Sequence, residues 1–381
     1  MKFDYVVVGA GIFGATTARL LTEAGASVLI LEKEMHPGGH CFTYNEEGIE
    51  IHKYGPHIFH TANDNVWAFV NRFSKWYPFD LKVKVNYDDD YYSFPINLMT
   101  LYQIYHDPWG EDGCGYNRKN DKESVLKRWK ADCHKIDDPK NFEEAALASV
   151  GRELYEIFFK GYTTKQWGTD PKNLPKEIFG RLPVRMDLND QYFARHRNKY
   201  QGIPTKGYTS FIGNIIGKTP VEYGFDATLE NLSKYKDSKV IYSGAPDNLL
   251  NFSLGRLPYR SLRFEIERHQ GTYQGVPIVN YTDINVPYTR ITEHKCFTPT
   301  EHPHTFISKE YPASYEETNQ PFYPIATDEN KSLYNEYVKL LREVSPNILL
   351  GGRLGTFQYL DMDQTVELAF AMVKGLIDGS H

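Results

Sequence analysis

The sequence lacks several features that would place it in common functional classes. No apolar run approaches the roughly 18 residues that cross a bilayer, and the apolar N-terminus runs into GAGIFG instead of a cleavage site. The net charge of −6 provides no broad basic surface for nucleic acid or an anionic membrane. We therefore expect a cytoplasmic protein that binds neither nucleic acid nor membrane.

Motifs for metal binding, disulfides and group transfer are also missing. The four cysteines, Cys41, Cys114, Cys133 and Cys296, form no CxxC pair or zinc spacing, so we expect no disulfide framework and no metal. No serine nucleophile elbow, P-loop or kinase motif set is present. Hydrolase and phosphotransferase functions therefore have little support.

What the sequence does have is the composition of an ordinary globular protein. Its 381 residues predict two or three domains at about 150 residues each. Hydrophobic residues make up 41% and charged residues 24%, which argues against disorder and coiled coil. The 28 tyrosines are unusual, and they suit pockets in which rings stack on a ligand and hydroxyls bind it.

The order of segments predicts an α/β fold. Residues 4–8 form a β-branched run, a helical stretch follows from Gly9 to Leu21, and a second strand runs over 27–31, which is a βαβ unit. Residues 96–165 look helical, with one apolar stripe over 147–158, and residues 172–324 contain alternating segments typical of antiparallel strands. A strand at 347–350 and a helix at 363–377 end the chain. We expect an N-terminal nucleotide fold completed by these late segments.

A glycine-rich turn marks the expected nucleotide site. Gly9, Gly11 and Gly14 follow the first strand and open the first helix, where a pyrophosphate finds free N–H groups. Glu32 ends the second strand, where an acid binds ribose hydroxyls. The second turn at Gly38 and Gly39 resembles FAD-binding flavoproteins of the glutathione reductase type, so FAD is favoured over NAD.

The chemistry of the residues alone does not decide which of them are catalytic. His52, His57 and His60 lie just downstream of the FAD motif, where they are either structural or reach the flavin ring. Several arginines stand beside Pro or Gly turns, namely Arg181, Arg185, Arg290 and Arg353. A guanidinium can bind two phosphate oxygens at once. Pairing with some of the 49 acidic residues is the structural alternative.

Blocks of sequence along most of the chain resemble the UDP-galactopyranose mutase family. They run in family order from Val6 to Gln364: GAGIFG, IHKYGPHIFHT, GYTTKQWG, RLPVR, QGIPTKGYT, LPYRSLRFE, NVPYTRITEHK, SKEYP, GGRL and YLDMDQ. The resemblance implies an α/β fold with a discontinuous Rossmann-like FAD-binding domain at 1–80, 206–250 and 325–381. It also implies a helical bundle at 96–170, an antiparallel sheet domain at 81–95, 171–205 and 251–324, and a homodimer.

The resemblance also assigns roles to residues that bind substrate. Arg181 and Arg290 match the two arginines that hold the substrate diphosphate, with Arg181 on a mobile loop. His60 matches a histidine beside flavin and sugar. The resemblance implies that further residues line the substrate site: Phe159, Tyr162, Thr163, Trp167, Tyr192, Arg260, Tyr323 and Tyr359.

A second set is implied to hold the cofactor. It consists of Gly9, Gly11, Gly14, Glu32, Gly38, Gly39, His40, His57, Val221, Gly352, Arg353, Leu360, Asp361 and Met362. The resemblance implies a redox-neutral isomerase that interconverts UDP-galactopyranose and UDP-galactofuranose, for galactofuranose and cell-wall polysaccharide synthesis. It also implies that N5 of reduced FAD attacks the anomeric carbon and that UDP leaves and returns.

Departures from the family pattern leave the sugar open. His40 stands where the family commonly has Asn, FDLKVKVNY lacks an Asn or His followed by Arg, and SFP replaces NLP. A mutase for UDP-N-acetylgalactosamine is therefore one alternative. An FAD oxidase or dehydrogenase of the amine-oxidase type and a flavin-stabilised binding protein without turnover are the others.

Overall fold

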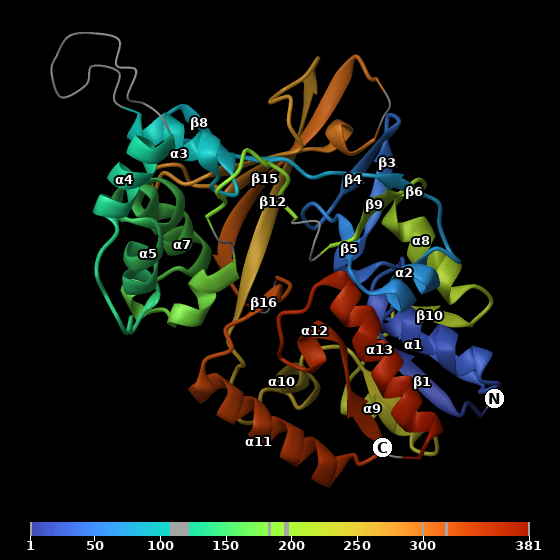
Figure 1. The fold of residues 1–381 in the computed structure, drawn as a ribbon. Helices are drawn as coiled ribbons and strands as arrows, with labels where there is room; N and C mark the ends of the chain where they lie inside the picture. The colour runs from blue at the N-terminus through green and yellow to red at the C-terminus, as the bar shows by residue number, and fades with distance from the viewer. Residues whose placement is uncertain are drawn as a thin grey trace, which may run out of the picture. The chain divides into compact units, whose positions relative to one another are not determined.

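The computed structural model (Figure 1) describes residues 2–106, 122–181, 184–193, 198–298, 301–316 and 319–379. The chain divides into two compact units. The first comprises Met1–Phe79, Arg195–Ser261 and Tyr315–His381, and the second comprises Asp80–Ala194 and Leu262–Ser314. The three-part domain division expected from the sequence stays a prediction.

A five-stranded parallel sheet forms the centre of the first unit. Its strands, in spatial order, are β10 (Val221–Tyr223), β2 (Val28–Glu32), β1 (Tyr5–Val8), β11 (Lys239–Tyr242) and β17 (Ile348–Leu350). All four neighbouring pairs are parallel. Segments from the beginning, middle and end of the chain therefore complete one nucleotide-binding type of sheet, as expected.

Helices cover both faces of this sheet, because successive residues of a buried strand point to opposite sides. Val6 and Val8 pack in a core with Tyr337 and Leu341 of α11 (Asp328–Val344). On the other face α1 (Ile12–Glu23) packs against α8 (Gly207–Ile216) and α13 (Met362–Ile377). The short helices of this unit are α9 (Leu229–Leu232), α10 (Pro246–Leu249), α12 (Gly352–Gly355), η1 (Gly39–Cys41) and η5 (Ser233–Tyr235).

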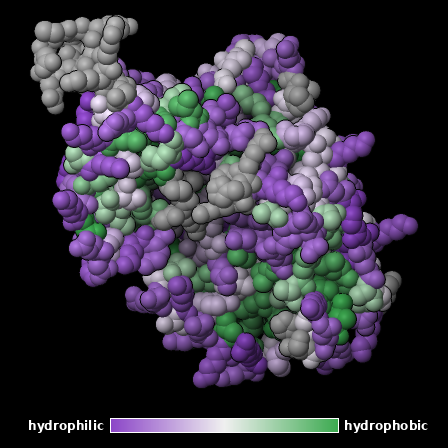
Figure 2. All heavy atoms as spheres, viewed as in Figure 1, coloured by the Kyte–Doolittle hydropathy of each residue, from purple (hydrophilic) through white to green (hydrophobic). Residues whose placement is uncertain are grey.

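Smaller β-structures complete the first unit. The hairpin of β3 (Thr43–Glu46) and β4 (Ile49–His52) is followed by a sheet in the order β5 (Phe59–Thr61), β9 (Tyr200–Pro204) and β6 (Trp76–Pro78), with α2 (Asp64–Val70) beside it. Figure 2 shows polar side chains over most of the face it presents, with apolar side chains gathered in the region of α13.

A mixed sheet forms the β-part of the second unit. In spatial order it contains β12 (Tyr259–Gln270), β15 (His304–Ser314), β14 (Arg290–Glu293), β13 (Ile278–Tyr281), β7 (Val83–Tyr87) and β8 (Asp90–Phe94). The pair β7–β13 is parallel, and the pairs β13–β14, β14–β15 and β7–β8 are antiparallel. The first residues of β12 belong to the first unit, where they pair with β16 (Tyr323–Pro324).

Helices make up the rest of the second unit: α3 (Leu98–Tyr105), α4 (Lys122–Asp132), α5 (Phe142–Val150), α6 (Arg152–Leu154), the π-helix η2 (Tyr155–Lys160), α7 (Gly161–Trp167), η3 (Pro171–Asn173), η4 (Lys176–Arg181) and η6 (His294–Phe297). Four residues of the expected apolar stripe over 147–158 are buried, but they lie on more than one helix: Leu147, Val150, Leu154 and Phe158. Gly151, at φ +87°, ends α5 and redirects the chain.

The predicted fold class is confirmed. The structure combines a parallel sheet with helices on both faces, a run of helices between residues 98 and 167, and a largely antiparallel sheet. Within the described residues, no helix is long and apolar enough to cross a membrane.

Candidate functional site

The glycine-rich turn in the first unit has the geometry of a phosphate cradle. Gly9 adopts φ +104°, and a Cβ on Gly14 would lie 1.9 Å from the carbonyl oxygen of Gly9. Helix α1 can therefore approach the turn only because residue 14 is glycine. Gly11 is the N-cap of α1 and has no side chain to bond the first-turn N–H groups, which suits an anion there.

The second glycine pair lies against this turn. The N–H of Gly38 donates to the carbonyl of Ala10 at 2.9 Å, and Gly38 forms a parallel bridge with Gly11. A Cβ on Gly39 would lie 3.1 Å from the Cα of Gly11. The two predicted glycine motifs therefore build one backbone surface.

Glu32 ends β2 beside the turn, as the sequence predicts. Its Oε2 accepts from the N–H of Ala10 at 2.5 Å, and its Oε1 accepts from the N–H of Glu34 at 2.8 Å. Burial raises the pKa of this carboxyl group. Because a carboxylate oxygen can accept more than one hydrogen bond, Glu32 can hold the turn and also accept a hydrogen bond from a ligand hydroxyl.

His40 follows the second glycine pair and packs beside aromatic residues. Its ring stacks on Phe322, with ring centroids 4.5 Å apart and an interplanar angle of 14°. Burial, then the charges of Arg353 and His57, lower the pKa of His40 to about 3. The imidazole is therefore neutral at physiological pH.

The predicted histidines are anchored by polar partners. His57 Nδ1 lies 2.8 Å from the carbonyl oxygen of Gly55. His60 Nδ1 lies 2.7 Å from Oδ1 of Asn198. Val221, a further predicted cofactor residue, begins the edge strand β10 and pairs with Ile30.

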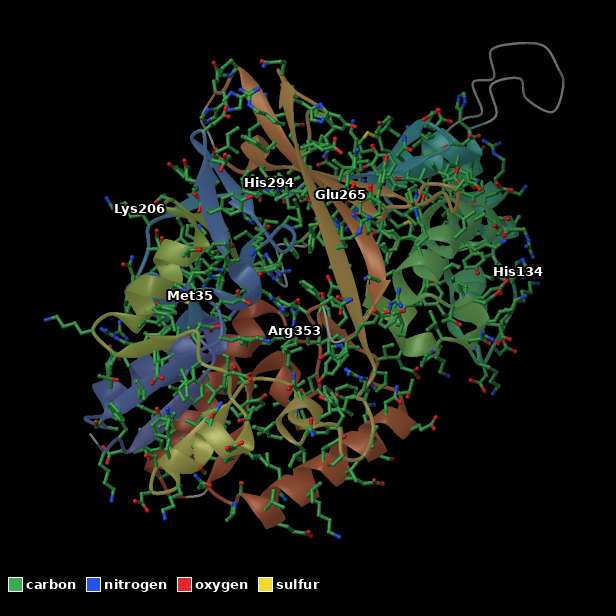
Figure 3. The ribbon with its side chains drawn as sticks, turned by 180° about the vertical axis from the view of Figure 1, so that it is seen from behind. Met35, His134, Lys206, Glu265, His294 and Arg353 are labelled. Carbon is green, nitrogen blue, oxygen red and sulfur yellow. The ribbon has the colours of Figure 1, made fainter. Side chains whose placement is uncertain are left out.

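Arg353 organises the segment between β17 and α13 (Figure 3). Its Nε and Nη2 donate to the carbonyl of Leu360 at 3.1 and 2.6 Å, and its guanidinium lies 4.9 Å from the ring centroid of Tyr359. Gly352, at φ +71°, precedes it. Asp361 caps α13, whose first residue is Met362, in a capping box with Gln364.

The same segment contains one predicted substrate residue, Tyr359, which contacts another, Tyr323. The rings of Tyr359 and Tyr323 stack with centroids 5.7 Å apart. Tyr323 pairs with Arg260 in the β12–β16 ladder. Burial lowers the pKa of Arg260. The structure thus brings Arg353 and Tyr359 together with Tyr323 and Arg260, which come from other parts of the sequence.

In the second unit Arg290 is held by polar groups from three elements. Its Nε donates to Oδ1 of Asn280 at 3.1 Å, its Nη1 lies 3.4 Å from Oε2 of Glu310, and its Nη2 donates to the hydroxyl of Tyr162 at 3.3 Å. Only 22% of the Arg290 side chain and 4% of the Glu310 side chain are exposed. The guanidinium orientation is therefore fixed by the fold.

Other predicted substrate residues of this unit lie in less polar surroundings. Phe159 packs with Phe142 and Phe179, and Tyr192 lies near Phe94. Thr163 is buried in α7, and Trp167 is the last residue of that helix. Arg181 ends η4, and its side chain lies outside what the structure describes.

Sequence reasoning missed Asn280, Glu310 and Asn198. Asn280 and Glu310 are buried polar residues within β13 and β15. A polar residue inside an otherwise apolar strand is a usable signal, because a buried polar group needs a partner. Within the described residues, no group of three or more His, Cys, Asp or Glu side chains is arranged to hold a metal ion.

Comparisons with known proteins identify a family for the chain. The sequence model of the UDP-galactopyranose mutase family matches residues 157–359, and that of an NAD(P)-binding Rossmann-like domain matches residues 7–73. The dTDP-fucopyranose mutase of Escherichia coli is 40% identical over 374 residues, with 96% of each chain covered. The probable UDP-galactopyranose mutase of Klebsiella pneumoniae is 40% identical over 368 residues, covering 95% of this chain and 92% of the relative.

A solved structure matches the fold. The crystal structure of a reduced UDP-galactopyranose mutase superimposes with a TM-score of 0.74, covering 99% of this chain and 96% of that chain at 16% identity.

Proposed function

The chain belongs to the UDP-galactopyranose mutase family, whose members are isomerases, and we propose that it isomerises a nucleotide-linked pyranose to its furanose form with FAD as cofactor. The observation that carries the proposal is the fixed guanidinium of Arg290 with Tyr162, Asn280 and Glu310. A planar fork held in place before the ligand arrives suits a diphosphate.

The residues of the first unit fit FAD. The backbone cradle at Gly9, Gly11 and Gly14 accommodates a pyrophosphate, since a Cβ at residue 14 would collide with the turn. Glu32 suits the ribose hydroxyls, and Arg353 with Asp361 suits the flavin region. When bound and reduced, FAD supplies a nucleophile for the anomeric carbon of the sugar.

The chain's own residues stabilise the departing nucleotide. Negative charge grows on the diphosphate as its bond to the anomeric carbon breaks, so a positive group aimed at it lowers the barrier. We assign this role to Arg290 and Arg181, and a further substrate-binding role to Arg260. The Tyr162 hydroxyl accepts from Arg290, so its own O–H is a donor suited to a phosphate oxygen.

Other residues bind and orient the substrate. Tyr323 and Tyr359 stack on each other, which fixes both hydroxyls relative to Arg353. We assign these tyrosines and Tyr192 to the diphosphate, and Phe159, Thr163 and Trp167 to the nucleotide and sugar. His60 is hydrogen-bonded through Nδ1 to Asn198, and we assign it to the sugar or the flavin edge. Holding UDP while it is detached keeps it available for the return step.

Two substrates are supported by the comparisons. A relative named UDP-galactopyranose mutase and one named dTDP-fucopyranose mutase are each 40% identical to this chain over nearly its whole length. UDP-galactopyranose is the first candidate because the family model carries that name. dTDP-fucopyranose is the second, and it requires a deoxynucleotide and a 6-deoxy sugar.

One experiment tests the function and separates these substrates. Anaerobic, dithionite-reduced protein is incubated with UDP-galactopyranose and, separately, with dTDP-fucopyranose, and the nucleotide sugars are chromatographed. We expect a furanose product from one substrate at much higher kcat/KM than from the other. No furanose product from either substrate would refute the proposal.

We also propose a cytoplasmic homodimer that supplies furanose donors for cell-surface polysaccharide. The support is the family resemblance alone, so the assembly needs its own test. Light scattering of the purified holoprotein is expected to give twice the 44.0 kDa chain mass. A monomer at micromolar concentration would contradict the dimer without affecting the proposed reaction.

A further inference from the structure

Lys165 on α7 is bonded in an unusual way. Its Nζ lies within hydrogen-bonding distance of four backbone carbonyl oxygens, which share its three N–H donors: those of Tyr281 at 2.8 Å, Asp283 at 2.8 Å, Val286 at 2.9 Å and Tyr288 at 2.9 Å. We call these four oxygens the carbonyl ring. They belong to the end of β13 and to the loop 282–289 that leads into β14. The sequence alone suggests nothing of this, because every residue carries a carbonyl.

Gly161 makes a second contact between the same helix and loop. A Cβ at this position would lie 2.1 Å from the carbonyl oxygen of Thr282 and 3.1 Å from the backbone nitrogen of Ile284. Residues 161 and 165 are one helical turn apart and share a face of α7. The helix is therefore seated on the loop at two points, backbone against backbone and ammonium against the carbonyl ring.

This contact controls where Tyr162 and Arg290 lie. Tyr162 follows Gly161 on α7, and Arg290 is the first residue after the loop. Arg290 Nη2 donates to the Tyr162 hydroxyl at 3.3 Å, so the bond joins the helix and the loop that Lys165 holds together. A shift of the loop against the helix would break this bond and move the Tyr162 hydroxyl away from the guanidinium.

We propose that Lys165 is a positioning residue that fixes Arg290 and Tyr162 for binding of the nucleotide diphosphate by tying α7 to the loop 282–289. The inference rests on the proposed function of Arg290. Removing the ammonium would take away the donor that the four converging carbonyl oxygens share, and a buried acceptor that loses a partner is costly. The loop would then open to reach water. Rings of backbone carbonyls also hold small monovalent cations, so a free alkylammonium ion suits the same place.

The test compares four variants as flavin-loaded proteins. Lys165→Ala and Lys165→Met remove the ammonium, and Lys165→Arg keeps a positive charge in a planar group that cannot point at all four oxygens. Lys160→Ala is the matched control, because Lys160 lies near the same helix, is 51% exposed and pairs with Glu156. Kinetics with the nucleotide sugar, UDP binding by calorimetry, flavin content and thermal unfolding are measured for each.

We expect the three Lys165 variants to bind UDP at least tenfold more weakly and to raise KM more than they lower kcat, with flavin content unchanged. Lys160→Ala should match the wild type. Adding n-propylammonium should restore UDP binding to Lys165→Ala in a saturable way and have little effect on Lys165→Met, whose side chain fills the space. A merely structural lysine would change unfolding without this selective rescue.

Several results would overturn the inference. They are wild-type UDP affinity and KM in Lys165→Met, equal effects in Lys160→Ala, or no amine rescue of folded Lys165→Ala. If Ala and Met variants do not fold, Lys165→Arg decides the matter, and wild-type KM in that variant refutes the role. Failure of the wild-type protein to turn over any nucleotide sugar would refute the proposed function instead, while UDP calorimetry would still test Lys165.

Discussion

Arg290 Nη1 lies 3.4 Å from Oε2 of Glu310, and only 4% of the Glu310 side chain is exposed. This buried carboxylate orients the guanidinium and offsets its charge before a ligand binds. A buried pair of this kind adds little to stability, because desolvation opposes the attraction. Its value lies in placing a rigid, planar cation where negative charge develops during the reaction.

Replacing Arg290 should abolish most turnover. Arg290→Ala should lower kcat/KM by roughly 10²- to 10³-fold, and Arg290→Lys should lose nearly as much, because a single ammonium cannot reach Asn280, Glu310 and Tyr162 together. Flavin content should stay normal. Arg263→Lys is the control, since Arg263 is 56% exposed and pairs with Glu265, which Figure 3 labels on β12. Near-normal turnover in Arg290→Lys would refute the bidentate role.

Tyr162→Phe removes only the hydroxyl that accepts a hydrogen bond from Arg290. A hydrogen bond to a charged group contributes about 1.5–3 kcal/mol, so kcat/KM should fall about tenfold or more. A double-mutant cycle provides the check, because the same change in an Arg290→Ala background should then have little further effect. Additive losses would show that the two side chains act independently.

Gly14→Ala should prevent flavin retention. The new Cβ would meet the carbonyl oxygen of Gly9 at 1.9 Å, so helix α1 would have to move away from the phosphate cradle. The ratio of flavin to protein absorbance measures the loss. Gly213→Ala on α8 is the matched control, because its Cβ would meet nothing within 4 Å, and it should add up to about 1 kcal/mol of stability. Full flavin content in Gly14→Ala would contradict the cradle.

His40 should make stability depend on pH. Folding lowers its pKa from 6.5 to about 3, so between these values the unfolded chain binds a proton that the folded chain does not. The free energy of unfolding therefore falls as the pH drops below about 6.5, by up to about 1.4 kcal/mol per pH unit. In urea titrations at pH 7.5, 6.5 and 5.5, His40→Asn should lose less stability than the wild type. Equal losses would show that His40 is protonated in the folded protein.

The parts of the fold set by local sequence could be predicted. The turn at Gly9, the helix after it and the acid at the end of β2 follow from residues close together in the chain, and the structure has them where expected. The break at Gly151 was missed, because a glycine within a helical pattern is often tolerated and its positive φ is set by tertiary packing. The parallel pairing of β7 with β13 could not be predicted either, because side chains alternate between the two faces of a sheet in the same way in parallel and antiparallel strands.

Long-range partners could not be predicted from the residues alone. The role of an arginine depends on the groups around it. The partners of Arg290 come from β13, β15 and α7, up to 128 residues away in the sequence. Lys165 looks like an ordinary surface lysine of a helix. Its partners are backbone carbonyls, which leave no mark on a sequence.

The proposed isomerisation involves no net redox change, and the electron balance of turnover can be measured. Reduced holoprotein is followed anaerobically for both furanose product and flavin absorbance, with no electron acceptor present. We predict many products per flavin while the flavin stays reduced. Product formation only after an electron acceptor is added, with one equivalent of acceptor consumed for each product, would refute an isomerisation.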